Sequence, residues 1–277
     1  MSCPRTSPTA GRFDGVTAVL PGIDLEGMAE RAALMTRTDR KYLVPAGLAA
    51  ELVHDLADDL HVLDIDRQRT FAYRSLYYDT PELLSYRTAA TRRRRRFKVR
   101  RREYVDAGTS FLEVKTRTGR GDTEKVREER SRSGGKLPRP GDGPLSGEDA
   151  VYVAERLQEA GVAPPEDRLF PTFETAYRRT TLLVGSEGSR TTIDESLVWR
   201  GTDLTSYSLE DLVVLETKSA VAPGAVDRWL WRSHRRPQRI SKFATGMALL
   251  DPRLPANRWH RTIGYLRPHV RSLASAA

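Results

Sequence analysis

The sequence contains a single cysteine, Cys3, among 277 residues. An intramolecular disulfide needs two cysteines, and a zinc site built on cysteines needs several, so both are excluded. No stretch approaches the roughly eighteen uninterrupted apolar residues of a membrane-spanning helix. Residues 1–15 contain no apolar segment of the kind found in signal peptides. We therefore predict a cytoplasmic protein without a membrane span.

Negative charge is the scarcer sign. The chain has 46 Lys and Arg residues against 37 Asp and Glu, a formal net charge of +9. Hydrophobic residues make up 39 % of the chain, which is enough for a core. The excess of positive charge favours an anionic partner: nucleic acid, a membrane surface or a phosphate-rich ligand.

Apolar residues at helical spacing predict helices over about residues 23–35, 46–60, 81–89 and 147–161, and in the segments PGAVDRWLWRSH and SKFATGMALL. Residues 1–20 are predicted to be a disordered N-terminal tail, and residues 263–277 a C-terminal tail. Residues 131–148 are rich in Gly and Pro and are interpreted as a loop inserted into a single domain that spans residues 21–262.

The segment RRRRRFKVRRREY, residues 92–104, looks at first like a solvated basic arm. Its second part alternates, however, with Phe97 and Val99 on one face of an extended strand. The opposite face carries Arg96, Lys98, Arg100 and Arg102. An ordinary sheet would turn such a face to water, and this strand alone leaves that alternative open. Arg92–Arg95 are interpreted as solvated charge.

Six further segments repeat the alternation of charged and apolar residues. Their charged residues are Arg37, Asp39 and Lys41 in RTDRKYLV; Glu113, Lys115 and Arg117 in FLEVKTRT; Lys125 and Arg127 in TEKVRE; Arg179 in TAYRRTTLLV; Arg190 and Asp194 in RTTIDES; and Glu216 and Lys218 in LVVLETKS. Strands of this kind can close into a barrel with a polar lumen. Lumenal cations repel one another, which predicts a bound polyanion, and the interleaved carboxylates suit Mg²⁺ or Mn²⁺. A metal ion with Lys and Arg is the usual equipment for phosphoryl transfer.

Eight segments also carry a family resemblance: RTDRKYLV, SLYYDT, RFKVRRREY, FLEVKTRTG, YRRTTL, TIDESL, VLETKS and SKFATGM. Over about residues 23–255 their order resembles the VTC domain, the polyphosphate polymerase domain of the vacuolar transporter chaperone family. That domain belongs to the triphosphate tunnel metalloenzymes, alongside the CYTH proteins. The resemblance implies an α+β fold, a closed antiparallel eight-stranded β-barrel with helices packed outside. It also implies an ATP-dependent enzyme that extends a polyphosphate chain.

The resemblance assigns catalytic roles in that transfer to Lys41, Arg100, Arg102, Lys115, Arg179 and Lys218. The same residues would bind phosphate, and Lys242 in the motif SKF joins them by resemblance. The alternation of the strands adds Lys98, Lys125 and Arg127. Glu216 resembles the metal-binding glutamate, and the interleaved carboxylates Glu113, Asp39 and Asp194 are further candidate ligands of Mn²⁺ or Mg²⁺.

The chain departs from the family pattern at its first motif. The CYTH enzymes begin with two glutamates where this chain has Arg37 and Asp39. The loss of a carboxylate suits a one-metal transferase better than a two-metal hydrolase. A hydrolase of tripolyphosphate or an organic triphosphate, and a non-catalytic polyphosphate-binding module, stay open as alternatives. Carboxylates among the basic residues make nucleic acid an unlikely partner, so ATP, triphosphate and polyphosphate are the expected ones.

Overall fold

The computed structural model describes residues 12–32, 38–119, 123–130, 138–203, 205–220 and 222–273. The chain divides into two compact units. Unit 1 comprises Met1–Phe71, Arg178–Glu195 and Asp211–Gln238, and unit 2 comprises Ala72–Tyr177, Ser196–Glu210 and Arg239–Ala277. Each unit has its own hydrophobic core, so each is described by itself below.

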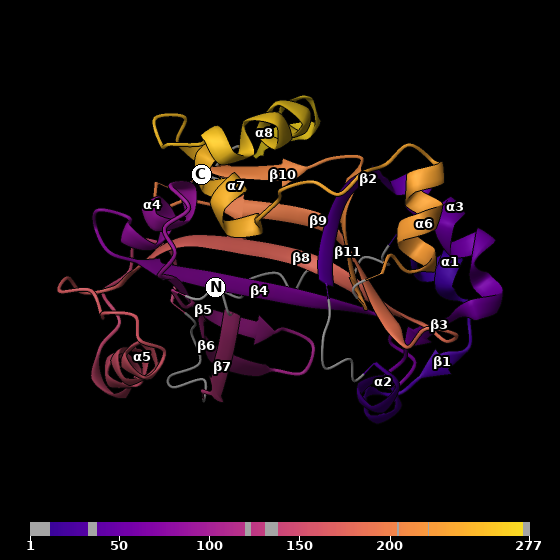
Figure 1. Ribbon diagram of the computed structural model, residues 1–277, viewed down its shortest axis with the longest axis horizontal. Helices are drawn as coiled ribbons and strands as arrows, with labels where there is room; N and C mark the ends of the chain where they lie inside the picture. Colours follow the sequence, from indigo (N-terminus) through magenta and orange to yellow (C-terminus); the bar gives the residue numbers. More distant parts are fainter. Residues whose placement is uncertain are drawn as a thin grey trace, which may run out of the picture. The chain divides into compact units, whose positions relative to one another are not determined.

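The elements are shown in Figure 1. Unit 1 contains α1 (Asp14–Thr17), β1 (Gly22–Ile23), α2 (Leu25–Arg31), β2 (Thr38–Pro45), α3 (Ala46–Asp55), β3 (Leu60–Leu63), β11 (Leu212–Ser219) and α6 (Ala225–Arg232). Unit 2 contains α4 (Leu84–Ala90), β5 (Arg96–Tyr104), β6 (Thr109–Arg117), β7 (Thr123–Glu129), α5 (Gly147–Glu159), β10 (Ser206–Leu209), α7 (Lys242–Leu250), α8 (His260–Leu266) and β12 (Val270–Leu273). The long strands β4 (Thr70–Asp79), β8 (Phe170–Val184) and β9 (Ser189–Arg200) have residues in both units.

The prediction of a closed eight-stranded barrel is wrong. In the described residues twelve strands form one sheet that is not closed. Eight of them follow one another in the order β12-β10-β9-β8-β4-β5-β6-β7. Of the other four, β11 pairs with β9 and β2, and β3 pairs with β8 and β1. The pairing is antiparallel wherever its register is known except between β1 and β3. Alternation in a sequence determines which residues share a face of a strand. It carries no information on the tilt and stagger that closure requires, and this is why the barrel could not be predicted reliably.

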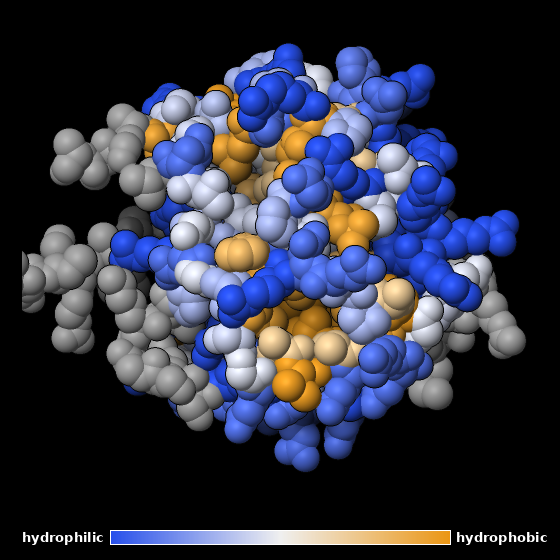
Figure 2. Space-filling view, turned by 90° about the vertical axis from the view of Figure 1, so that its left-hand side faces the viewer, coloured by the Kyte–Doolittle hydropathy of each residue, from blue (hydrophilic) through white to orange (hydrophobic). Residues whose placement is uncertain are grey.

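The core of unit 2 forms on the apolar face of β5 and β6. Phe97, Val99, Leu112 and Val114 are buried there and pack with α5 through residues such as Leu157. Every second residue of β5 and β6 is therefore directed away from this core. Figure 2 looks onto the side of the molecule that carries α4 and α5 in Figure 1, and hydrophilic residues cover much of it, with smaller apolar areas between them.

Helix α7 approaches its neighbours in unit 2 unusually closely at Gly246. A Cβ atom at this position would lie 2.4 Å from Phe173 Cζ and 2.4 Å from Trp199 Cδ1. The indole nitrogen of Trp199 also donates a hydrogen bond to the Lys242 carbonyl, at 3.0 Å. The absence of a side chain at Gly246 thus determines how near α7 lies to these two rings.

The core of unit 1 lies between helices α3 and α6 and the apolar face of β2, β9 and β11. Tyr42, Val44, Ile193, Val213 and Leu215 are buried on that face. The region predicted as an N-terminal tail contributes Phe13 and Leu20 to the same core, while residues 1–11 lie outside the described part of the chain.

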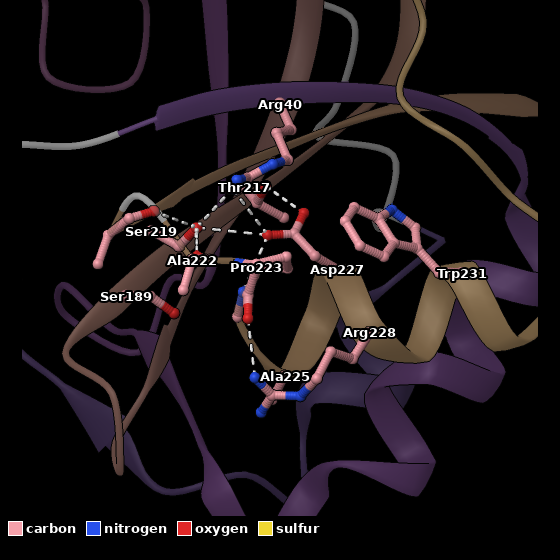
Figure 3. A network of polar contacts seen from close by, with 12 residues as sticks. Arg40, Ser189, Thr217, Ser219, Ala222, Pro223, Ala225, Asp227, Arg228 and Trp231 are labelled. Carbon is pink, nitrogen blue, oxygen red and sulfur yellow. Dashed lines mark hydrogen bonds and ion pairs between the residues drawn. The ribbon is translucent and has the colours of Figure 1, made fainter.

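A buried polar network fastens α6 to the same face of β2 and β11 (Figure 3). The carboxylate of Asp227 is fully buried and accepts hydrogen bonds from Tyr42 Oη and Thr217 Oγ1, both at 2.7 Å, and from Arg40 Nη1 at 3.2 Å. Burial and the hydrogen bond to Asp227 raise the pKa of Tyr42 far above its usual range, so its phenol stays protonated. Because residues 40, 42 and 217 face α6, the alternating residues Lys41 and Glu216 face the other way.

Beyond residue 262 the described chain continues through the end of α8 into β12, which pairs with β10. Among the described residues no helix is both long enough and apolar enough to cross a membrane.

Candidate functional site

A surface rich in positive charge covers the face of β5, β6 and β7 opposite the core of unit 2. We call it the cationic face. Its charged residues are Arg96, Lys98, Arg100, Arg102, Glu113, Lys115, Arg117, Lys125, Arg127 and Glu129. The predicted alternation is confirmed in β5 and β6, where Phe97, Val99, Leu112 and Val114 are buried on the other side, and in β7, where the partly buried Val126 packs against the same core.

Like charges stand directly opposite one another on this face. Lys98 pairs in register with Lys115, which pairs in turn with Lys125, so three ammonium groups cross three strands in one row. Next to this row, Arg96 stands opposite Arg117. Such pairs destabilise a sheet unless an anion lies between them. The lysine row therefore favours binding of an anion with several charges.

Lys98 experiences this repulsion most directly. Its Nζ donates a hydrogen bond to Ser241 Oγ at 3.1 Å and lies 5.4 Å from the ring centroid of Phe243, so α7 covers it. Burial, followed by the charges of Lys115 and Arg100, lowers the pKa of Lys98 to about 7. At neutral pH this lysine is partly deprotonated, and a neighbouring anion would favour its charged form.

Glu113 is the carboxylate at the centre of the cationic face. It accepts a hydrogen bond from Arg100 Nε at 2.6 Å and forms an ion pair with Lys125 Nζ at 2.8 Å. Burial alone would raise the pKa of Glu113, but Arg100, Arg102 and Lys125 outweigh it and hold the pKa at about 2. The carboxylate is thus ionised and is engaged in positioning Arg100 and Lys125.

Aromatic rings hold other cations of unit 2. Arg102 lies over Tyr73 at 5.8 Å, Arg127 over Phe111 at 4.8 Å and Lys242 over Tyr177 at 4.7 Å. A ring attracts a cation without neutralising its charge. Sequence reasoning missed Tyr73 and Phe111, although the pattern was present: both occupy positions in phase with the charged residues of neighbouring strands.

Unit 1 carries a second charged surface, on the side of β2 and β11 that faces away from α6 and continuing onto β9. We call it the paired face and define it by Asp39, Lys41, Arg179, Asp194, Glu216 and Lys218. Lys41 Nζ lies 3.1 Å from Glu216 Oε2, and Lys218 contacts both Glu216 and Asp39, the latter at 3.0 Å. Arg179 forms a bidentate pair with the buried Asp194, at 2.6 and 2.9 Å. Cations here lie against carboxylates.

The carboxylates differ in how they could serve a metal ion. Within the described residues there is no group of three or more His, Cys, Asp or Glu side chains that could hold a metal by themselves. Asp39 and Glu216 share the ammonium of Lys218. Thr192, opposite Glu216, has a buried hydroxyl for which the described residues offer no hydrogen-bond partner. Two carboxylates and a hydroxyl fit Mg²⁺ or Mn²⁺ when phosphate oxygens and water supply the remaining ligands.

The predicted site residues therefore fall into separate groups. Unit 2 brings together Lys98, Arg100, Arg102, Lys115, Lys125 and Arg127 on one face and places Lys242 on α7. Unit 1 brings together Asp39, Lys41, Glu216 and Lys218, and joins Arg179 to Asp194. Glu113 and Asp194 each bind an arginine in the structure, while Arg37 lies outside the described residues.

The sequence matches the family model described as the VTC domain over residues 36–251. No curated protein matches the chain.

Several solved structures are similar to it at low identity. A Vibrio parahaemolyticus protein described as a candidate adenylate cyclase is 12 % identical, with 77 % of this chain and 98 % of that chain covered and a TM-score of 0.42. A Hippeastrum protein described as having a dominant triphosphatase activity is 16 % identical, with 77 % and 96 % covered and a TM-score of 0.42. A protein of Pyrococcus horikoshii is 14 % identical, with 74 % and 91 % covered and a TM-score of 0.38. None of these likenesses is close enough to assign an activity.

Proposed function

Because the chain belongs to the VTC domain family, we propose that it is an ATP-dependent polyphosphate polymerase. In this reaction the γ-phosphoryl group of ATP is transferred to a growing polyphosphate chain with the help of Mn²⁺ or Mg²⁺. The observation that carries the proposal is the row of Lys98, Lys115 and Lys125, which brings three lysines together across three strands, with Glu113 of the adjacent row paired to Lys125.

In this proposal the cationic face binds the phosphate chain. Phosphate oxygens between Lys98, Lys115 and Lys125 would replace cation repulsion by charge-assisted hydrogen bonds, each worth about 1.5–3 kcal/mol. Glu113 fixes the orientation of the planar guanidinium group of Arg100. A guanidinium held in this way suits the binding of one phosphate group at a defined position along the polyphosphate. Binding would also restore the proton of Lys98, whose pKa is lowered to about 7 in the free protein.

The paired face supplies the candidate metal ligands, of which Glu216 and Asp39 fit best. A metal ion held there with phosphate oxygens would neutralise charge that develops during phosphoryl transfer. Lys218, which contacts both carboxylates in the structure, would have to release them and become available to a phosphate oxygen. The buried hydroxyl of Thr192 can donate a hydrogen bond to the same ligand.

The test is incubation of the purified protein with ATP and Mn²⁺ or Mg²⁺, following ADP release and phosphate-chain length together. Wild-type protein is expected to make long chains, and Glu216→Gln is expected to lose turnover while keeping its fold. Lys115→Ala should weaken tripolyphosphate binding about ten- to a hundred-fold. Release of free phosphate without chains would replace the polymerase by a hydrolase. Binding without any turnover would leave a polyphosphate-binding module.

A further inference from the structure

The arginine run that precedes β5 is held in place by the end of a helix. The backbone N–H of Arg93 donates to the carbonyl of Thr88 at 2.9 Å, and that of Arg92 donates to Ala89 at 3.4 Å, which closes the last turn of α4. Arg96 Nη1 donates to the Arg93 carbonyl at 2.7 Å. Arg92–Arg95 are exposed, and these bonds hold the backbone of Arg92 and Arg93. The run is therefore anchored at its start and is not a free arm.

The closing residue of α4 has a conformation that arginine rarely adopts. Arg92 has φ 57°, in the left-handed region where glycine is the usual residue after a helix. A cation at a helix C-terminus is favourable, but that interaction would equally be supplied by a neighbour such as Arg93. An arginine in a conformation that glycine adopts more easily, without an evident structural gain, points to a functional cause.

Further arginines extend this group. Arg96 stands opposite Arg117 across β5 and β6, and Arg258 Nη1 donates to the carbonyl of Ala89 at 2.9 Å, in the last turn of α4. We call the set the outer arginine cluster, and its members are Arg92, Arg93, Arg94, Arg95, Arg96, Arg117 and Arg258. In the part of the chain that the structure describes, none of the seven forms an ion pair with a carboxylate.

The positive charges of the cluster help to lower the pKa of two of its members. Burial, then Arg117 and Arg258, lower the pKa of Arg96. Burial, then Arg92, Arg239 and Arg117, lower the pKa of Arg258. Repulsion of this kind is relieved by an anion, and an anion longer than a single phosphate group would touch several members at once.

The cluster is continuous with the lysine row of the cationic face. Arg96 and Lys98 are alternate residues of β5, and Arg117 and Lys115 are alternate residues of β6, so each pair is about 7 Å apart along its strand. A chain bound along Lys98, Lys115 and Lys125 that continues past this edge therefore meets arginines next.

We propose that the outer arginine cluster is a binding subsite for the part of a linear polyphosphate chain that extends beyond the lysine row. The proposal rests on the proposed function for the identity of its ligand. A triphosphate is short enough to be held by the lysine row alone, so its binding would not need the arginine run. A longer polyphosphate would reach the run.

The experiment compares a short and a long ligand in the full chain. Arg93, Arg94 and Arg95 are replaced together by Gln, and binding of tripolyphosphate and of long-chain sodium polyphosphate is measured at several salt concentrations. We expect tripolyphosphate affinity to stay within about twofold, while long-chain affinity falls by about tenfold or more with a shallower salt dependence. A control with the same change in charge replaces the exposed Arg232, Arg267 and Arg271 by Gln and should leave both affinities unchanged.

Arg92→Gly separates charge from folding. Glycine adopts the left-handed conformation freely, so the melting temperature should rise while long-chain affinity falls. Equal long-chain affinity in wild type and in both variants would overturn the proposal. A loss of the same size for duplex DNA would also overturn it, since the cluster would then be a general polyanion surface. If wild type makes no chains from ATP while the triple Gln variant still loses affinity for the long chain only, the polymerase proposal fails and the subsite stands.

Discussion

The cationic face and the paired face are built by the same alternation of charged and apolar residues, but their charges meet different neighbours. On the paired face, Lys41 lies opposite Glu216 and Lys218 lies opposite Asp39 across β2 and β11. On the cationic face, Lys98 lies opposite Lys115 and Arg96 lies opposite Arg117. The cross-strand neighbour therefore decides whether a charged residue lies opposite an unlike charge or a like charge in the folded chain. Four predictions test this comparison, from the largest expected effect to the smallest.

The largest effect is expected at Asp194, the buried carboxylate of the paired face. Asp194→Asn removes the anion that Arg179 contacts with two of its nitrogens. Breaking a buried ion pair from one side typically costs about 3–5 kcal/mol of unfolding free energy, to be measured by urea denaturation. The double variant Arg179→Met with Asp194→Leu should recover much of this loss. A loss below about 1 kcal/mol in the single variant would show that the pairing is unimportant for the fold.

Removing a lysine should have opposite effects on the two faces. Lys98→Met removes a repelled cation, so the free protein should melt at a higher temperature, while tripolyphosphate affinity falls about ten- to a hundred-fold. Lys218→Met removes a cation that two carboxylates contact, so the free protein should melt at a lower temperature. Thermal unfolding with and without tripolyphosphate measures both. If both variants melt lower than wild type, the distinction between the faces is lost.

The third prediction concerns pH and Lys98. Its pKa is lowered from 10.5 to about 7 in the folded protein. Below pH 7 the lysine is charged in the folded and unfolded chain alike, and its repulsion acts in full. Between about pH 7 and 10.5 only the unfolded chain keeps the proton, so this group makes the unfolding free energy rise with pH. Anion binding should raise the pKa of Lys98 again, so that the lysine takes up a proton.

Calorimetry of tripolyphosphate binding near pH 8, in buffers with different ionisation enthalpies, measures this proton uptake. Wild type should take up a fraction of a proton, and its affinity should fall more steeply with rising pH than that of Lys98→Met. The ligand's own titration is common to both proteins and cancels in the comparison. Identical uptake by wild type and variant would assign the proton to another group.

The smallest effect is expected at Asp39, the exposed end of the paired face. Its side chain is 36 % exposed, and its ion pair with Lys218 is accordingly screened by water. Asp39→Asn should change the unfolding free energy by less than about 1 kcal/mol in urea denaturation. If Asp39 is a metal ligand, the Mn²⁺ concentration needed for half-maximal activity should nevertheless rise. Unchanged metal dependence would leave Glu216 as the carboxylate ligand of this face.

The sequence allowed the faces of the strands to be predicted, because the phase of Phe97 and Val99 against Lys98 and Arg100 follows directly from a period of two. It did not allow prediction of which strands become neighbours. The engagement of Glu113 with Arg100 and Lys125 depends on the register of three strands, and sequence reasoning placed Glu113 among the metal ligands instead. The family resemblance was correct, whereas the closed barrel was not.

The network around Asp227 could not be predicted from the sequence either. Its members Arg40, Tyr42 and Thr217 lie 187, 185 and 10 positions from Asp227 in the chain, and only the packing of α6 on β2 and β11 brings them together. Polar residues on an otherwise apolar face gave no periodic signal, so a buried carboxylate at this point could not be inferred. Its partners become evident only when the helix has been placed.

Gly246 leads to an expectation about related sequences. The rings of Phe173 and Trp199 occupy the space that a methyl group at residue 246 would need. A relative with alanine at this position would keep the same helix only if one of the two rings were replaced by something smaller. Residues 173, 199 and 246 should therefore change in concert when many members of the family are aligned, as a compensating triplet that links a helix to two distant strands. Such a correlation would be visible in sequences alone, without any measurement on the protein.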